Sequence, residues 1–261
     1  MTNYKTIIIN HTDKVATLWL NRPDKHNALN PDLMREVIHF FQYIENDEQV
    51  RMVVIRGCGK SFCAGADLNW MKNAAQLSDE ENLNDCRLLT EFFSTIYHSR
   101  KITIGIAHGN VFGGGNGLVA ACDIAYGLAD SCFSLSETRL GLIAATITPY
   151  MLNRLQSSVY KELIFTAKPF NGKEAEKYGL INRSFVGIDE LEIELEKALN
   201  AMRNAGPQSL IGSKRLINDL LNPSKKNEIV SQIPKILADV RTSEEAKEGF
   251  AAFLEKRKPN W

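Results

Sequence analysis

Two glycine-rich loops constrain what this chain can fold into more than any other feature of its sequence. The apolar runs Met52–Ile55 and Ile102–Ile106 are typical of buried strands, and each leads into a glycine-rich loop followed by a candidate helix. The second loop contains three consecutive glycines, Gly113–Gly115, before the apolar segment Leu118–Ala121. Consecutive glycines cost conformational entropy, so we expect them where the chain turns sharply or approaches a ligand closely.

A strand that passes through a glycine turn into a helix leaves backbone N–H groups free at the helix N-terminus, where a developing negative charge is favoured. The Gly113–Gly115 segment is therefore interpreted as one half of an oxyanion hole. Glu137 follows between two serine-containing turns, in an otherwise apolar frame. Burial would raise its pKa into the range useful for acid/base chemistry, so we expect it to act as the acid/base beside the hole.

The order of elements predicts an α/β fold. Two strands near the N-terminus, Thr6–Asn10 and Val15–Leu20, precede a helix that begins at Asn30-Pro31. Later strands alternate with helices over connections long enough for parallel crossovers. From Met151 on the chain is expected to be mostly helical, and Thr242–Glu245 is interpreted as the capping box of a last helix.

Composition excludes several classes of function. The 261 residues are 44% hydrophobic and 24% charged, as in globular proteins with a substantial core, and 31 Lys+Arg balance 31 Asp+Glu. This neutrality gives no general attraction to nucleic acid or to anionic membranes. The N-terminal segment shows no signal peptide or membrane span, so a cytoplasmic location is expected. The 5 cysteines are scattered, which favours reduced thiols and argues against a metal site.

A phosphate-binding loop is the main rival interpretation of the glycines. Gly59-Lys60-Ser61 resembles the end of a Walker motif, but Val54 stands where that motif needs its first glycine. Neither loop has the G-x-G-x-x-G pattern, so a nucleotide-hydrolysing function is disfavoured. Tight structural turns without any catalytic role remain open from spacing alone.

Five segments in order resemble the enoyl-CoA hydratase/isomerase (crotonase) family, and the resemblance covers essentially the whole chain. They are Leu20-Asn21-Arg22-Pro23 with Asn27-Ala28-Leu29-Asn30, Ser61–Leu68, Phe112–Gly115 with Ala121–Ile124, Glu137–Leu142, and Glu244–Arg257.

The resemblance implies a fold, a substrate and an assembly. The fold would be a crotonase-type spiral of ββα units over residues 1–195, carrying the acyl-CoA site, with a C-terminal helical region over 196–261 used for oligomerisation and for covering the site. The substrate would be an acyl-CoA thioester, so coenzyme A is part of the substrate and neither a separate cofactor nor a metal is expected. Family members commonly form trimers or dimers of trimers, so a homo-oligomer is expected.

The resemblance also implies roles for individual residues. The backbone N–H groups of Ala66 and Gly114 would hold the thioester oxygen, one from each glycine loop, and Glu137 would transfer protons. The residues expected to contact coenzyme A or the substrate are Lys25, His26, Ala28, Ala64, Asp67, Leu68, Phe253 and Lys256. The last two lie in the final helical segment, which in many members reaches the site of a neighbouring subunit.

One departure from the family pattern bears on the reaction. Hydratases of this family typically carry two glutamates, but Gly117 stands at the position of the first. Glu137 would then act alone, with Asn116 as a hypothetical water-positioning residue. Replacing Gly117 by Glu is expected to broaden activity toward simple enoyl-CoA substrates. Arg139 or Arg154 is a weak candidate for binding a distal carboxylate of the substrate.

The segment Ser136–Tyr150 is similar to that of bacterial 3-methylglutaconyl-CoA hydratases of leucine degradation, which implies hydration of 3-methylglutaconyl-CoA or a related branched enoyl-CoA. Two alternatives stay open. A single glutamate also resembles enoyl-CoA isomerases, and a coenzyme A- or RNA-binding family member without turnover is a third possibility, although the neutral charge balance does not favour binding to nucleic acid.

Overall fold

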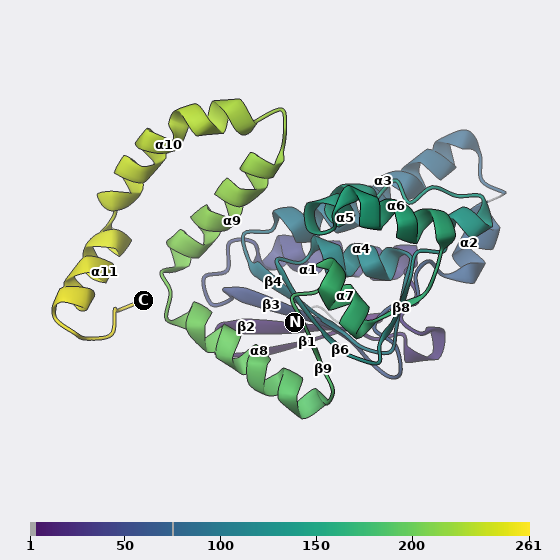
Figure 1. Cartoon of the computed structure of the whole chain (residues 1–261), viewed down its shortest axis with the longest axis horizontal. Coiled ribbons are helices and arrows are strands. Elements are labelled where there is room, and N and C mark those ends of the chain that lie inside the picture. Colours follow the sequence, from purple (N-terminus) through teal and green to yellow (C-terminus); the bar gives the residue numbers. More distant parts are fainter. Residues whose placement is uncertain (1–3, 75) are drawn as a thin grey trace. The chain divides into compact units, whose positions relative to one another are not determined.

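The computed structural model describes residues 4–74 and 76–261 of the chain (Figure 1). They form two compact units that divide between Glu192 and Ile193, whereas the sequence placed the boundary at residue 195. The helix α8 (Ile188–Arg203) runs through this division. No helix in the described part of the chain is both long and apolar enough to cross a membrane.

The first unit is built on a mostly parallel sheet. Within the described residues its strand order is β1-β2-β3-β4-β6-β9, in which β1 pairs antiparallel with β2 and each further pairing is parallel. The strands are β1 (Ile7–Thr12), β2 (Val15–Leu20), β3 (Met52–Gly57), β4 (Ile102–Ala107), β6 (Ile124–Leu128) and β9 (Arg183–Phe185). The carboxyl ends of β3 and β4 therefore lie at the same edge, and the two glycine-rich loops leave the sheet side by side.

Helices cover one face of this sheet (Figure 1). In α1 (Pro31–Ile44) the apolar residues recur at helical spacing, and Leu33, Val37 and Phe41 are buried against the core. The side chain of Asn30 accepts a hydrogen bond from Leu33 N–H, so the predicted cap is confirmed. The helix α3 (Asp79–His98) packs beside α1 and follows the short helix α2 (Leu68–Ala74). The sequence predicts a helix around Leu68–Ala75, of which the last residue, Ala75, lies outside the described residues.

A second, smaller sheet completes the repeating units. Its order is β5-β7-β8 within the described residues, from β5 (Asn110–Phe112), β7 (Cys132–Ser134) and β8 (Phe170–Asn171). Thus β4, β5 and α4 (Gly114–Ala121) follow one another as a strand of each sheet and a helix, and β6 and β7 lead in the same way to α5 (Thr148–Arg154) and α6 (Ser157–Thr166). This is the predicted spiral of ββα units.

The glycine run forms the first turn of α4 rather than a loop ahead of it. Gly113 is the N-cap with φ 47°, a left-handed value that glycine adopts without strain, and Gly114 and Gly115 are already helical. The sequence placed the start of this helix at Leu118, because glycine is a poor helix former. Close packing overrides that preference, since a β-carbon at Gly115 would collide with the carbonyl oxygen of Cys63.

Arg154 caps the other end of α4. Its guanidinium donates hydrogen bonds to the carbonyl oxygens of Ala120 (3.3 Å), Cys122 (2.5 Å) and Leu180 (3.2 Å). A buried cation at a helix C-terminus both satisfies free carbonyl groups and complements the helix dipole. Burial lowers the pKa of Arg154, while the nearby Cys122 and Asp123 raise it.

The second unit consists of helices. After α8 come α9 (Pro207–Leu221), α10 (Lys226–Arg241) and α11 (Glu244–Leu254), with α10 packed against both of its neighbours. The predicted capping box is wrong, because the N-cap of α11 is Ser243, whose side chain accepts from Ala246 N–H. Glu245 instead accepts hydrogen bonds from the N–H groups of Gln208 (2.8 Å) and Ser209 (2.8 Å), which begin α9.

Replacing Arg154 by Met should destabilise the first unit. The substitution keeps the apolar stem but leaves several carbonyl groups without a charged donor, and hydrogen bonds to charged groups contribute about 1.5–3 kcal/mol each. We expect the free energy of unfolding in urea to fall by roughly 3 kcal/mol. The control is Arg139→Met, because the exposed Arg139 makes a 3.3 Å hydrogen bond to Thr166 O and its loss should change stability little. Equal stability of the two variants would contradict this role.

Candidate active site

The two glycine-rich loops are joined directly by backbone hydrogen bonds. Cys63 N–H donates to Asn110 O (3.2 Å) and Phe112 N–H donates to Cys63 O (3.0 Å), so the segment after β3 pairs in parallel with β5. Gly65 also lies close to Phe112, because a β-carbon on Gly65 would be 3.0 Å from its carbonyl oxygen. The loops that the sequence assigned to one site therefore lie against each other.

The N–H groups of Ala66 and Gly114 have no hydrogen-bond acceptor among the described residues. Ala66 is held on both sides, because Leu29 N–H donates to Gly65 O (2.7 Å) and Asp67 N–H donates to Leu29 O (2.8 Å). Gly114 is the first residue of α4, where helix geometry leaves the N–H without an internal partner. Both N–H groups are thus without an acceptor among the described residues, and their role as oxyanion donors stays a prediction.

An ion pair supports the Ala66 loop. Arg22 donates to Asp67 Oδ2 (2.8 Å) and to the carbonyl oxygen of Ala28, which ties this loop to the segment before α1. Asp67 Oδ1 accepts from the N–H groups of Asn69 and Trp70. Burial alone would raise the pKa of Asp67, but these hydrogen bonds and the Arg22 charge lower it. Its carboxylate therefore supports this loop from within the protein, and the predicted contact of Asp67 with coenzyme A stays a prediction.

Glu137 lies beside the glycine turn. It begins the short helical turn η2 (Glu137–Leu140), and a β-carbon on Gly113 would be 3.3 Å from its Oε1. Its other oxygen, Oε2, is buried and has no hydrogen-bond partner among the described residues. Burial raises the pKa of Glu137, against the lowering effect of its own backbone N–H. A carboxyl group with a raised pKa and a free buried oxygen is suited to proton transfer.

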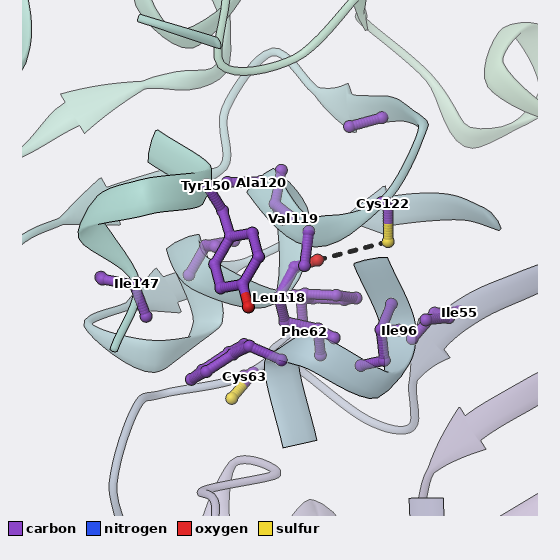
Figure 2. Close-up of a cluster of buried hydrophobic side chains, with 14 of the residues drawn as sticks. Ile55, Phe62, Cys63, Ile96, Leu118, Val119, Ala120, Cys122, Ile147 and Tyr150 are labelled. Atoms are coloured by element: carbon purple, nitrogen blue, oxygen red, sulfur yellow. Dashed lines mark hydrogen bonds between the residues drawn. The ribbon is translucent and has the colours of Figure 1, made fainter. Parts of the chain in front are cut away.

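Gly117 faces side chains rather than open space. A β-carbon there would collide with Ile147, 2.8 Å from its Cβ, and would lie 3.0 Å from Phe93 Cε1. Ile147 and Phe93 are both buried, and Figure 2 shows Ile147, Tyr150 and Leu118 in one cluster of buried side chains. The space that a second glutamate would need is filled by hydrocarbon, so the expectation that Gly117→Glu broadens activity is corrected.

Asn116 links the first turn of α4 to the strands β5 and β7. Its fully buried amide Nδ2 donates to Val111 O (2.9 Å) and Ser134 O (2.8 Å). It follows Gly114 by two residues, about 200° around the helix, and so lies on a different side of α4 from that N–H. Its buried Oδ1 has no partner among the described residues, and a role in positioning water stays a prediction.

The residues predicted to contact coenzyme A in the first unit form one neighbourhood. His26 Nδ1 is 3.0 Å from Ser61 Oγ, and Ala64 N–H donates to His26 O (3.0 Å). Lys25 and His26 are exposed, Ala28 is buried, and Leu68 is 80% exposed, which leaves its side chain open to a ligand. Phe253, 82% exposed, and Lys256 belong to the second unit, and their predicted contact with coenzyme A stays a prediction.

Neither arginine considered for a distal carboxylate is placed at the centre of the site. Arg154 is committed to the C-terminal end of α4, whereas the Gly114 N–H lies at the N-terminal end. Arg139 donates to Thr166 O and is exposed.

Sequence reasoning missed the roles of Arg22 and Ile147. Arg22 belongs to the Leu20–Pro23 motif, so the motif could have identified it as a site residue. Nothing in the sequence spacing connects Ile147 to Gly117.

Comparisons with known proteins agree with this geometry. The model of the family described as enoyl-CoA hydratase/isomerase matches residues 10–261. The chain belongs to the enoyl-CoA hydratase/isomerase family. It is 32% identical to the crotonyl-CoA hydratase of Syntrophomonas wolfei over 99% of this chain and 98% of that one. It is also 30% identical to the peroxisomal Delta(3,5)-Delta(2,4)-dienoyl-CoA isomerase of Arabidopsis thaliana over 100% and 98%.

A solved structure confirms the crotonase-type fold. The crystal structure of an enoyl-CoA hydratase from Shewanella pealeana superimposes with a TM-score of 0.93 at 32% identity, covering 99% of this chain and 96% of that one. The family membership makes this chain an enzyme of the hydratase/isomerase kind, and an acyl-CoA substrate is consistent with the family. Hydratases and isomerases both occur among its relatives, so similarity alone does not distinguish hydration from isomerisation.

Glu137→Gln should abolish turnover without preventing ligand binding. Glutamine keeps the size of the side chain but cannot accept and return a proton, so we expect kcat to fall by about 10²–10⁴-fold. Binding of a saturated acyl-CoA, measured by isothermal titration calorimetry, should change little because both N–H donors remain. The control Glu174→Gln alters a capping-box residue of α7 (Gly172–Tyr178) and should keep full activity. A fully active Glu137→Gln enzyme would show that another group transfers the proton.

Gly117→Ala should destabilise the enzyme because its methyl group would push into Ile147. Overpacking of a core typically costs about 1–3 kcal/mol, and we expect a loss of that size in the free energy of unfolding. In an Ile147→Ala background, which lacks the Cγ2 methyl group at the contact, Gly117→Ala should cost less stability. Additive effects in a double-mutant cycle would contradict direct contact between these positions.

Proposed function

We propose that this enzyme hydrates a 2-enoyl-CoA thioester, adding water across the 2,3 double bond through an enolate held by the N–H groups of Ala66 and Gly114. The observation that carries the proposal is the carboxyl group of Glu137, buried beside this pair of donors with one oxygen unengaged. The resemblance of Ser136–Tyr150 to 3-methylglutaconyl-CoA hydratases supports 3-methylglutaconyl-CoA or a related branched enoyl-CoA as the substrate.

The reaction can be written with Glu137 as the one proton carrier. The thioester oxygen accepts hydrogen bonds from the two N–H groups, which polarises the conjugated double bond. The Glu137 carboxylate takes a proton from water as the water oxygen bonds to the β-carbon, and the electron pair of the double bond moves into the enolate. The protonated Glu137 then gives this proton to the α-carbon, which returns the carboxylate to its starting state.

The oxyanion pair supplies the electrostatic part of this scheme. Preorganised donors of this kind are worth about 3–4 kcal/mol each in the transition state. The dipole of α4 points its positive end at the same oxygen, and Arg154 neutralises the carbonyl groups at the opposite end. Because Ala66 is fixed by backbone hydrogen bonds on both sides, little reorganisation is needed as charge develops.

An enoyl-CoA isomerase is the second candidate. The filled space at Gly117 favours it, because moving one proton between two carbons needs a single base and no attacking water. The dienoyl-CoA isomerase relative from Arabidopsis thaliana is consistent with this candidate.

We also propose a homo-oligomer in which Phe253 and Lys256 contact coenzyme A. The zero net charge gives no support for nucleic-acid binding.

The substrate prediction is tested with purified enzyme and a small panel of thioesters. The absorbance of the conjugated thioester should disappear on addition of enzyme to 3-methylglutaconyl-CoA or crotonyl-CoA, with the branched substrate turned over at the higher kcat/KM. A 3-enoyl-CoA provides the contrast, because its isomerisation creates the same absorbance. Turnover of the 3-enoyl-CoA without hydration of either 2-enoyl-CoA would establish the isomerase instead.

The pH dependence follows from the raised pKa of Glu137. Because the scheme starts from the carboxylate, kcat/KM should fall as the pH drops below the folded-state pKa. The midpoint of this acidic limb should lie above the value of about 4.3 found for an unperturbed glutamate. A limb at or below that value, measured with a substrate of constant charge, would contradict the assignment.

A further inference from the structure

Both side-chain amide hydrogens of Asn116 are used inside the protein. The amide Nδ2 donates to Val111 O (2.9 Å) and to Ser134 O (2.8 Å), and the residue is fully buried. These two acceptors fix the orientation of the amide, because the reverse orientation would place its oxygen against both carbonyl oxygens. The orientation leaves Oδ1 buried without a partner among the described residues, and the two donated hydrogen bonds offset that cost.

The carbonyl group of Ser134 joins Asn116 to the glycine turn. Besides the Asn116 amide, Ser134 O accepts the N–H of Gly113 (2.9 Å), and Gly113 O accepts the N–H of Asn116 (2.9 Å). These hydrogen bonds form a closed ring between the first turn of α4 and the end of β7. A buried network of this kind holds two segments more rigidly than any one of its bonds.

Glu137 belongs to the segment that this ring holds. It follows Ser134 by three residues, and a β-carbon on Gly113 would lie 3.3 Å from its Oε1. Directly after Glu137, Thr138 Oγ1 donates to Ile164 O (2.8 Å) of α6. The ring and this hydrogen bond therefore anchor the chain before and after the carboxyl group.

The glycine turn is also held from another direction. Phe112 N–H donates to Cys63 O (3.0 Å), and Gly115 approaches the same carbonyl oxygen too closely for a side chain. Loss of the Asn116 amide leaves these contacts in place, so the turn should keep its position. The segment that ends at Glu137 should move instead.

We propose that Asn116 is a positioning residue, which acts through Ser134 and holds the Glu137 carboxyl group beside the Gly113–Gly114 turn. It contacts neither the ligand nor the transferred proton. Because Gly117 leaves no room for a second acid, the reaction depends on the placement of this one carboxyl group. The inference rests on the role of Glu137 as proton carrier in the function proposed above.

Two variants remove the amide and create opposite packing defects. Asn116→Leu keeps the branched shape but adds the bulk of two methyl groups, whereas Asn116→Ala leaves a small cavity. The loss that they share is the pair of hydrogen bonds. For both we expect kcat of hydration to fall about ten- to a hundredfold with KM within about twofold, because a catalytic group displaced by about 1 Å can lose about a hundredfold in rate.

Exchange of the α-hydrogens of butyryl-CoA with deuterium oxide is the second measurement. This exchange needs Glu137 and the oxyanion donors but no addition of water, so a hydratase and an isomerase would both catalyse it. We expect exchange to fall in both Asn116 variants by the same factor as hydration. Loss of hydration alone would place the effect on the attacking water and overturn the inference.

A double-mutant cycle shows whether Asn116 acts through Glu137. In a Glu137→Gln background, Asn116→Leu should lower the residual exchange rate by less than about twofold, because the group that it positions is already gone. The same large loss in both backgrounds would overturn the inference, since Asn116 would then act on the oxyanion donors.

Thr103→Val is the matched control for lost stability. Thr103 is fully buried near the start of β4, and its hydroxyl donates to Asp123 Oδ2 (2.9 Å) and accepts Asp123 N–H (3.0 Å). Valine keeps the shape and removes these hydrogen bonds, so the free energy of unfolding in urea should fall while kcat stays unchanged. A loss of kcat equal to that of the Asn116 variants would overturn the inference, because the rate would then follow stability.

The wild-type enzyme separates a failure of the hydratase function from a failure of this inference. If it exchanges α-hydrogens but hydrates no enoyl-CoA, the hydratase function is overturned, and the exchange rates of the variants decide the role of Asn116. If it catalyses neither reaction, both are overturned. Unchanged rates in both Asn116 variants overturn the inference and leave the hydratase function standing.

Discussion

The close approach of two backbone segments underlies the whole site. The chain after β3 and the first turn of α4 touch through Gly115 and the carbonyl group of Cys63, at a distance that no side chain would permit. Backbone hydrogen bonds between Cys63, Asn110 and Phe112 hold this approach. The N–H groups of Ala66 and Gly114 are brought toward one another only because these segments meet, and the oxyanion hole that we propose is built from these backbone donors.

The surrounding side chains make this arrangement rigid and dry. Arg22 and Asp67 fix one segment, Asn116 ties the other to the small sheet, and Arg154 closes the far end of α4. Ile147 and Phe93 fill the space beside Gly117 that a second carboxylate would need. Glu137, whose burial raises its pKa, is the group that we propose to transfer the proton.

Much of this was predictable from sequence, for identifiable reasons. The glycine loops, the order of strands and helices and the isolated Glu137 are local patterns, and the family resemblance linked them into one fold. The start of α4 was misplaced because packing of Gly115 against Cys63 outweighs helix propensity. The role of Ile147 depends on its contact with the distant Gly117, and no periodicity in the sequence indicates such a contact. The ion pair between Arg22 and Asp67 was not predicted, because the two residues lie far apart in the sequence.

The central claim is that one oxygen of the substrate lies between the two N–H donors while Glu137 faces the reacting carbons. The most direct measurement is a crystal structure of the enzyme with a bound acyl-CoA. We expect the thioester oxygen at about 2.7–3.1 Å from the nitrogen atoms of both Ala66 and Gly114, with the Glu137 carboxyl group over the α- and β-carbons. A thioester oxygen bound elsewhere, or an acyl chain directed away from Glu137, would contradict it.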